Sequence, residues 1–532
     1  MALWRPQVVG LAVFVLCFSG LQLLLQAADP PSYVAAVYEH RVRLNPEPGV
    51  PLERRSALRH MRTNLRVLEE QTALAAQQGA QIIVFPEDAI HGFNFSRSSI
   101  SGYLESVPDP QEITWSPCAD PHRFPDTEVL QSLSCMAHRN NLFIVANMPS
   151  RLTCNQTSDP HCPADGRYQF NTNVVFSDKG VIVARYHKQN LYFEAAFDAP
   201  PEPQYVTFNT PFAGRFGVFT CFDILFRDPA VTLVKDLGVR QIVYPTAWMN
   251  QLPLLAAVQI QQSFAHAAGV TLLAANIKAA EYGITGSGIF TPWDSLMHHD
   301  TQGSSGKLLV RRVPVLDPLF IGDVKSNVLK LAPFSGYPKI GLEPNKKMHV
   351  WSSSDANYCK KDFDCTSTSF NSIMMHDNFT LVPLRGHDGN VSVCSGSVCC
   401  HLLFWRSETL EFYALGVFNG LHVVNGVYYL EVCAVVKCTS GDHSSCGGET
   451  EHAQTVMDFR LTGTFGTKHV FPGILGNGMT LDVPDHSGWE DENRFYMSRR
   501  GMRAGLVTAV LYGRHYEKDN NRFYNTNEKI SV

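Results

Sequence analysis

The stretch Gly217-Val-Phe-Thr-Cys221-Phe-Asp-Ile-Leu-Phe226 decides the fold and places a candidate nucleophile. Val218-Phe-Thr220 predicts a buried strand that runs into Cys221, and Asp228-Pro229 predicts the N-cap and first position of a helix that Gly238 ends. In an α/β sheet the ligand crevice opens where strands stop, so a thiol there can meet a substrate. A cysteine on its own is more often a small buried hydrophobic residue, so the rest of the chain must distinguish the two interpretations.

The composition is that of an ordinary globular chain. Its 532 residues allow about two to four domains of roughly 150 residues each. Hydrophobic residues make up 45% and charged residues 17%, a balance that excludes global disorder. The net charge is −5 and no basic run is interleaved with aromatic residues, so nothing indicates a nucleic-acid partner.

The N-terminal segment 1–28 predicts a cleaved signal peptide. Arg5 supplies the positive charge, residues 8–25 are almost wholly apolar, and Ala27-Ala28 suit cleavage before Asp29. The alternative is an uncleaved anchor, since the apolar stretch approaches membrane-spanning length. The polar segment 516–532 lacks the hydrophobic tail of a GPI signal. We therefore expect a secreted, extracellular protein without a membrane anchor.

The cysteines and the glycosylation signals agree with secretion. Of 14 cysteines, Cys17 lies in the predicted signal peptide and Cys221 is the candidate nucleophile. The other 12 form an even set, as six disulfides would need, although their pairing stays open. They are Cys118, Cys135, Cys154, Cys162, Cys359, Cys365, Cys394, Cys399, Cys400, Cys433, Cys438 and Cys446. Four N-glycosylation sequons occur, at Asn94, Asn155, Asn378 and Asn390.

Residues 29–330 predict an α/β domain. Helices are expected where apolar residues recur every three or four positions, beginning near Leu58, Val129 and Leu254, with Asp126 as the cap of the second. Short apolar runs predict strands at 33–38, 81–85, 142–146, 173–176, 181–185, 241–244 and 270–274. Strands that alternate with helices, with a few hairpins, imply a sheet covered by helices.

Residues 331–532 predict a second, mostly β domain. Helical periodicity fades there, and short β-like runs separated by turns take over. Eight of the twelve cysteines expected to pair lie in this part, so disulfides should stabilise it. Glycines, prolines and polar turns over 325–344 mark the boundary between the two domains.

Most catalytic signatures are absent from the chain. There is no GxSxG elbow, no HExxH, no P-loop and no GxGxxG that opens a helix. His298-His299 followed by Asp300 offers metal-ligating groups, but no spaced partner ligands accompany them, and there is no CxxC pair. We interpret the His298–Asp300 segment as a solvated loop and expect no metal.

Three reactive side chains follow three predicted strands. Glu87 comes after the strand 81–85, Lys188 after the hairpin strand 181–185, and Cys221 after its own strand. Taken singly, Glu87 could be a helix cap and Lys188 a solvated charge. Together they form a coherent set, because a carboxylate can take the proton of a thiol while an ammonium stabilises the oxyanion of acyl transfer.

These residues and their neighbours resemble the Glu–Lys–Cys triad of the nitrilase superfamily, the carbon–nitrogen (CN) hydrolases. The matching motifs, in chain order, are Phe85-Pro-Glu-Asp88, Tyr186-His-Lys-Gln-Asn190 and Phe219-Thr-Cys-Phe-Asp223. The resemblance implies a four-layer αββα catalytic fold. It also implies that Glu87 is the base, Lys188 the oxyanion stabiliser and Cys221 the nucleophile.

Further motifs resemble the biotinidase–vanin branch of this superfamily. They are Tyr38-Glu-His40, Gly92-Phe-Asn-Phe95, 165–170, 244–250, 285–289, Val398-Cys-Cys400 and Tyr413-Ala-Leu-Gly416. Segments 121–124, 191–198 and 251–257 are closer to biotinidases, whereas 185–190 and 228–236 are closer to vanins. The resemblance covers about residues 33 to 518, and we favour the biotinidase side.

The resemblance implies a secreted amidase that needs no cofactor. Biocytin and biotinyl-peptides would be cleaved to biotin and lysine or lysyl-peptides through a thioester on Cys221, and transfer of biotin to another amine would use the same thioester. The alternative is a pantetheinase that releases pantothenate and cysteamine. A weaker alternative is a carrier that holds a small molecule without hydrolysing it, against which an intact triad counts. The oligomeric state stays open.

Three further residues are second-tier candidates. Glu194 follows Lys188 by six positions and could orient its ammonium, although a surface acid is an equal alternative. The backbone N–H of Phe222 could join Lys188 at the oxyanion. Trp248, after the strand 241–244, could form a wall of the pocket, although a core aromatic is the more common role.

Overall fold

The structure, a computed structural model, describes residues 31–316, 369–407 and 411–519. The predicted signal peptide, the predicted domain boundary at 330/331 and the cysteines Cys17, Cys359 and Cys365 lie outside the described residues. No helix within the described ranges is long and apolar enough to cross a membrane.

Two six-stranded sheets form the centre of the first domain. One has the order β12-β1-β2-β3-β4-β5 and the other β11-β10-β9-β8-β7-β6. The first sheet consists of β1 (Ser32–Glu39), β2 (Ile82–Val84), β3 (Phe143–Thr153), β4 (Arg167–Phe176), β5 (Ile182–His187) and β12 (Lys307–Pro314). The second consists of β6 (Thr207–Thr210), β7 (Gly214–Val218), β8 (Gln241–Thr246), β9 (Thr271–Asn276), β10 (Ser287–Phe290) and β11 (Ser295–His298).

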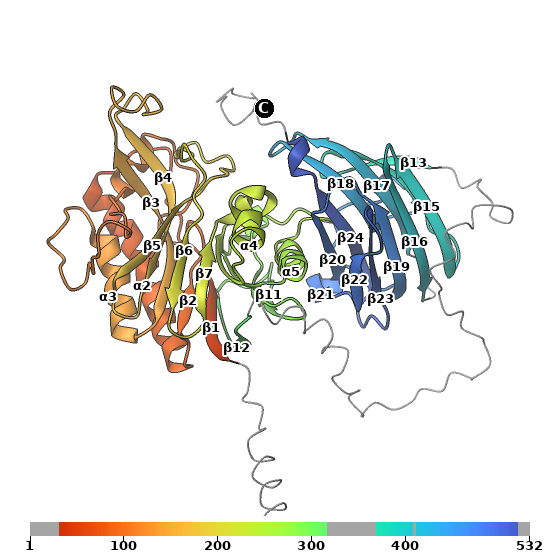
Figure 1. Ribbon diagram of the computed structural model, residues 1–532, viewed down its shortest axis with the longest axis horizontal. Coiled ribbons are helices and arrows are strands. Elements are labelled where there is room, and N and C mark those ends of the chain that lie inside the picture. Colours follow the sequence, from red (N-terminus) through yellow and green to blue (C-terminus); the bar gives the residue numbers. More distant parts are fainter. Residues whose placement is uncertain (1–30, 317–368, 408–410, 520–532) are drawn as a thin grey trace, which may run out of the picture.

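Helices cover the outer face of each sheet. Figure 1 shows α2 (Arg54–Gln77) and α3 (Glu128–Asn140) outside the first sheet, and α4 (Thr232–Lys235) and α5 (Ala257–Ala268) outside the second. The expected four-layer αββα arrangement is confirmed.

Side-chain alternation along β1 shows how the layers pack. Ala35 and Val37 belong to the core between the two sheets, whereas Ala36 and Tyr38 belong to the core beneath α2 and α3. Successive side chains of a strand point to opposite faces, so one strand serves two cores. Within each sheet the central strands are parallel, β1-β2-β3 and β7-β8-β9, and their carboxyl ends therefore share an edge.

Two helix beginnings differ from the expectation. The N-cap of α3 is Thr127 and not Asp126, because the buried carboxylate of Glu105 accepts the N–H groups of Val129 (2.9 Å) and Leu130 (3.1 Å). A carboxylate from another part of the chain thus satisfies this helix end. The helix after Asp228-Pro229 begins with a π-helical turn, Arg227–Val231, which leads into the four-residue α4.

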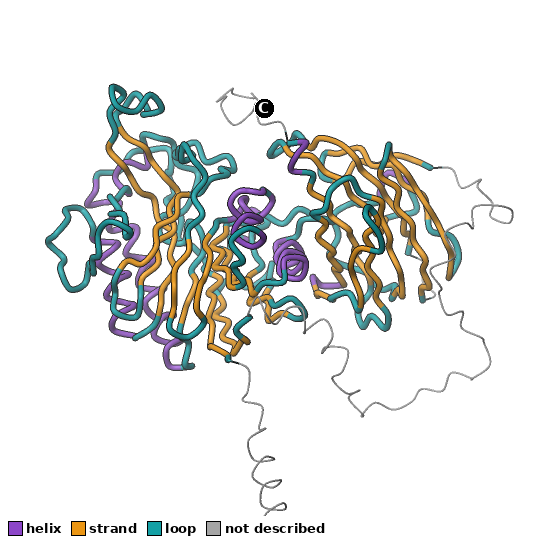
Figure 2. Tube along the Cα trace, in the orientation of Figure 1, coloured by secondary structure: helices purple, strands orange, loops and turns teal. Residues whose placement is uncertain are grey.

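The second domain is a sandwich of two sheets within the described residues, as Figure 2 shows, and the strand pairs in both sheets are antiparallel. Its larger sheet is β13 (Phe370–Met374), β14 (Asp377–Pro383), β17 (Phe412–His422), β18 (Tyr428–Cys438), β24 (Leu506–Arg514), β20 (Val470–Gly476) and β21 (Thr480–Asp482). Its smaller sheet is β15 (Asp388–Ser395), β16 (Val398–Arg406), β19 (Met457–Thr464), β23 (Arg494–Arg499) and β22 (His486–Trp489). The prediction of a mostly β second domain with disulfides is confirmed.

The larger sheet of the second domain packs against α5 of the first. The rings of Phe264 on α5 and Phe471 on β20 stack with their centroids 6.0 Å apart. At Gly473 a Cβ atom would lie 2.5 Å from Oγ of Ser263, so the strand and the helix are in close contact. One continuous buried core extends from the first domain through α5 into the larger sheet. Both faces of α5 are therefore buried.

Five disulfides occur among the described residues. They are Cys118–Cys135, Cys154–Cys162, Cys394–Cys399, Cys400–Cys433 and Cys438–Cys446. Within the described residues Cys221 is the free cysteine, and it is buried. Disulfides of this number are typical of an oxidising compartment.

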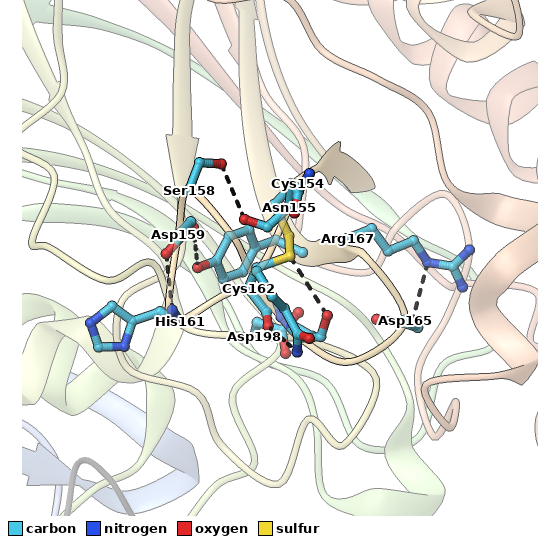
Figure 3. Close-up of a disulfide and its surroundings, with 12 residues drawn as sticks. Cys154, Asn155, Ser158, Asp159, His161, Cys162, Asp165, Arg167 and Asp198 are labelled. Carbon is cyan, nitrogen blue, oxygen red and sulfur yellow. Dashed lines mark hydrogen bonds and ion pairs between the residues drawn. A yellow bond between two sulfur atoms is a disulfide. The ribbon is translucent and has the colours of Figure 1, made fainter.

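The predicted glycosylation sites differ in accessibility. Asn94, Asn155 and Asn378 are exposed, whereas Asn390 on β15 is half-buried. Figure 3 shows Asn155 next to the Cys154–Cys162 disulfide, in the loop between β3 and β4. The disulfide restricts this loop, and the asparagine side chain stays open to solvent.

We expect Phe471→Ala to destabilise the protein by about 3–5 kcal/mol, because it removes a buried ring from the domain interface and leaves a cavity. The matched control is Phe412→Ala, since Phe412 is 56% exposed whereas Phe471 is 7% exposed. Denaturant unfolding of the two variants and the parent measures the difference. Equal midpoints for the two variants would show that the α5–β20 contact contributes little to stability.

Candidate active site

Cys221 lies at a sharp turn after β7. The strand ends at Val218, and Cys221 begins a 3₁₀ turn over Cys221–Leu225. Its φ of +47° is in the left-handed region, where a residue with a side chain is strained and is retained only if its surroundings hold it. The thiol is buried and contributes to the wall of a cavity. The position after a strand is as expected, although β7 (Gly214–Val218) ends two residues earlier than the predicted strand Val218–Thr220.

Asp223 holds this turn in place. Its carboxylate accepts the phenol O–H of Tyr186 (2.7 Å), the backbone N–H of Thr220 (3.0 Å) and both the backbone N–H (2.9 Å) and the side-chain amide (2.8 Å) of Asn190. Tyr186 and Asn190 flank Lys188, so one buried carboxylate ties the Cys221 turn to the lysine segment. Burial raises the pKa of Asp223 to about 6, although these hydrogen bonds oppose the shift.

Glu87 and Lys188 form a buried ion pair. Glu87 follows β2 and Lys188 follows β5, and Lys188 Nζ lies 2.7 Å from Glu87 Oε1. Their side chains are 2% and 1% exposed, so the pair is almost wholly removed from water. Lys188 also pairs with Glu194, which is therefore not a surface acid.

Donors from three different elements fix Glu87. Besides Lys188, the side-chain amide of Asn171 on β4 donates to Glu87 Oε1 (2.8 Å), and the N–H of Ala247 after β8 donates to Oε2 (2.9 Å). The other N–H of the Asn171 amide donates to Glu194 Oε2 at 2.7 Å. Asn171 thus clamps both carboxylates that hold Lys188.

Burial and neighbouring charges set the protonation of the cluster. Burial on its own would lower the pKa of Lys188. Its interactions with Glu194, Glu87 and Cys221 outweigh the effect of burial and raise that pKa well above its usual value. Burial and the charge of Glu87 raise the pKa of the Cys221 thiol well above its usual value, although Lys188 opposes them. The lysine is therefore charged and the resting cysteine neutral, so the thiol needs a base before it can attack.

A partly open cavity lies beside Cys221, with ≈360 Å³ of empty space that includes open solvent. Apolar and aromatic side chains form most of its wall: Tyr192, Phe222, Leu225, Trp248, Met249 and Leu255. The remaining wall comes from Cys221, Ala247 and Gln251 and, in the second domain, Asn425 and Tyr428. Trp248 is both a buried aromatic and part of the pocket wall.

Comparison with known proteins matches two family models, "Carbon-nitrogen hydrolase" over residues 58–289 and "Vanin C-terminal domain" over 368–519. The chain is 51% identical to a biotinidase of Takifugu rubripes, over 95% of this chain and 98% of the relative. It belongs to the biotinidase–vanin branch of the carbon–nitrogen hydrolases. Human biotinidase is 49% identical over 92% of this chain and 90% of its own, and a pantetheinase of Canis lupus familiaris is 44% identical over 96% and 93%. The carbon–nitrogen hydrolase fold of this chain thus carries an amide-hydrolase site.

Several residues of the site were not predicted. Asn171 is one residue beyond the motif 165–170, and it carries no signal of its own, because a buried strand asparagine is visible only through its partners. Asp223 belongs to the Cys221 motif, but the sequence alone does not indicate its role in holding the turn. Asn425 and Tyr428 lie more than 200 residues from Cys221 in the chain, in the second domain.

The His298–Asp300 segment is not a solvated loop, contrary to the expectation. All three residues are half-buried, and Asp300 Oδ2 lies 2.5 Å from Nζ of the buried Lys278. Nε2 of His299 lies 3.1 Å from Glu451 Oε1, a residue of the second domain. The segment serves the contact between the domains, which its sequence neighbours could not indicate.

We expect Asn171→Leu to lower kcat/KM by about 10- to 100-fold, since the near-isosteric side chain removes two hydrogen bonds to carboxylates. The Asn171 amide lowers the pKa of Glu194, which burial raises, so its removal should raise that pKa further. The acidic limb of the kcat/KM profile against pH should then move to higher pH. Asn209→Leu, at an exposed strand asparagine, is the matched control. An unchanged profile in both variants would contradict the role of Asn171.

Proposed function

We propose that the chain hydrolyses biotin amides, releasing biotin from biocytin and biotinyl-peptides. The observation that carries the proposal is the cluster of Glu87, Lys188 and Cys221, whose Cys221 lines a mostly apolar cavity. The chain is also more similar to biotinidases (49–52% identity) than to pantetheinases (43–44%). The protein would act on small-molecule substrates and, with its disulfides and exposed sequons, outside the cell.

The first half of the reaction forms an acyl-enzyme. Glu87 takes the proton of the Cys221 thiol as the sulfur attacks the amide carbonyl carbon, and a C–S bond forms. The carbonyl oxygen becomes an oxyanion, which the Lys188 ammonium and the Phe222 N–H stabilise. The C–N bond then breaks, and Glu87 returns the proton to the leaving amine, which departs as lysine or a lysyl-peptide.

The second half releases biotin. Glu87 takes a proton from a water molecule, which attacks the thioester carbon, and the same oxyanion stabilisation applies. The C–S bond breaks, the thiolate regains a proton from Glu87, and biotin leaves. If an amine replaces the water, the same thioester transfers the biotinyl group to that amine. All proton transfers use side chains of this chain.

In this mechanism Lys188 and its two carboxylates, Glu87 and Glu194, have different roles. Glu194 holds the Lys188 ammonium and does not need to exchange protons, whereas Glu87 is held by the N–H of Ala247 and the amide of Asn171. A fixed ammonium loses little energy to reorganisation when the oxyanion forms. Glu194 and Asn171 are in this proposal positioning residues.

Pantetheine hydrolysis is the second candidate function. The chain is 44% identical to a pantetheinase over 96% of its length, and the same cluster would perform the same steps on a pantetheine amide. The products would then be pantothenate and cysteamine. A carrier that binds without turnover would have no use for a thiol, base and ammonium in one site.

We expect Cys221→Ala to retain the fold and to lose amide hydrolysis, since no other free cysteine is present among the described residues. The purified protein and the variant are offered equal biocytin and pantetheine, and the products are separated by mass. Biotin and lysine, absent with the variant, would support the proposal. Cysteamine and pantothenate would assign the chain to pantetheinases, and turnover by the variant would contradict the nucleophile.

Lys188→Met should lower kcat by at least about 100-fold, because it removes the charge proposed to stabilise the oxyanion. Circular dichroism and thermal unfolding test whether the variant is folded, since the change leaves Glu87 and Glu194 buried without their cation. Lys437→Met is the control, because Lys437 pairs with Glu411 away from the cavity. A folded Lys188→Met enzyme with a near-normal rate would exclude the proposed role.

A further inference from the structure

The turn between β17 and β18 brings the second domain into the active site. It spans residues 423–427, and its Asn425, together with Tyr428 at the start of β18, lines the same cavity as Cys221. The catalytic cluster itself lies wholly in the first domain. The cavity in which it acts is therefore a composite of two domains.

Contacts at the nucleophile's own turn hold this hairpin in position. A Cβ atom on Gly426 would lie 2.6 Å from Cζ of Phe222, so the backbone of the hairpin contacts the residue that follows Cys221. The ring of Tyr428 meets those of Phe222 and Phe226 at centroid distances of 6.2 and 6.1 Å. The position of Asn425 relative to Cys221 is thus set by close packing.

The buried Arg514 contacts both the β17–β18 hairpin and the turn that Cys221 begins. The Arg514 guanidinium lies over the Tyr428 ring at 4.9 Å, and its Nε donates to the carbonyl of Leu225 at 2.7 Å. Leu225 is the last residue of the turn that Cys221 begins. Because Arg514 is fully buried, these contacts are shielded from water.

Asn425 contributes an unpartnered polar group to a mostly apolar wall. Its carboxamide makes no hydrogen bond to any described residue, and Gln251 is the other carboxamide of the cavity wall. A carboxamide offers an N–H donor and a carbonyl acceptor side by side. In pockets that are mostly apolar, a few such groups fix the orientation and specificity of the ligand.

We infer that Asn425 is a specificity-determining residue that binds the ureido group of the biotinyl moiety. This inference rests on the proposed function. A ureido group presents a carbonyl acceptor next to N–H donors, which matches the donor and acceptor of one carboxamide. The apolar ring and acyl chain would lie along Phe222, Trp248 and Tyr428, with the amide carbonyl at Cys221. The second domain thereby selects the acyl group, and the first performs the chemistry.

The backbone at Asn425 dictates which substitutions test this. Its φ is +63°, a conformation that Asn, Asp and Gly adopt readily and other residues do not. Asn425→Gly removes the carboxamide without strain, and Asn425→Asp keeps the acceptor and removes the donor. Val423→Ser is the control in the same turn, because Val423 is 57% exposed and is not part of the cavity wall.

The experiment measures kcat/KM for biocytin and the rate at which iodoacetamide alkylates Cys221. Asn425→Gly should lower kcat/KM by about 10- to 100-fold, Asn425→Asp should also lower it, and Val423→Ser should leave it unchanged. The alkylation rate should stay the same in all variants, since iodoacetamide has no ureido group.

Two results would overturn the inference alone. One is an Asn425→Gly enzyme within twofold of the parent on biocytin. The other is an alkylation rate that falls in parallel with kcat/KM, which would mean that the turn only supports Phe222. A parent enzyme that releases no biotin from biocytin would refute the proposed function and this inference together, so the two failures are distinguishable.

Discussion

The buried ammonium of Lys188 is the constraint on which the rest of the site depends. A charge removed from water is stable only if opposite charges and hydrogen bonds replace its hydration. Glu87 and Glu194 supply the charges, and both carboxylates are in turn held by the single amide of Asn171. An ion pair enclosed in this way cannot rearrange without leaving a buried charge unpaired. In the proposed mechanism, this rigidity would let the ammonium stabilise an oxyanion without prior movement.

The sheets explain how residues from distant parts of the chain reach this ion pair. Glu87 and Lys188 follow strands of the first sheet, whereas Cys221 and Ala247 follow strands of the second. The N–H of Ala247 on Glu87 and the Asn173 amide on Thr220 (2.8 Å) are hydrogen bonds that cross from one sheet to the other. Glu87, the proposed base, is therefore part of the joint between the sheets, so the packing that stabilises the fold also positions its carboxylate relative to the Cys221 thiol.

Features that depend on the local sequence could be predicted, whereas features that depend on residues far away in the chain could not. The αββα fold followed from alternating strands and helices together with the family motifs, because hydrophobic periodicity is a local property. The three reactive residues could be named because each follows a strand in a recognisable motif. The N-cap of α3, the partners of His299 and the role of Asn171 could not be predicted, since each depends on a group far away in the chain: Glu105, Glu451 and Glu87 respectively. Asn425 needed the relative placement of two domains.

The position of α5 bears on why the two domains occur together. In the four-layer fold this helix covers the outer face of the second sheet, and β20 of the second domain covers its other side. Without the second domain, the side of α5 that packs against Phe471 would be exposed to water, an exposure that favours association or misfolding. At the same interface, Arg514 donates a hydrogen bond to the carbonyl of Leu225, and the β17–β18 turn packs against Phe222. Burial of α5 thus fixes the second domain against the turn that holds Cys221, the proposed nucleophile, and a wall of the cavity follows from the packing that stabilises the interface.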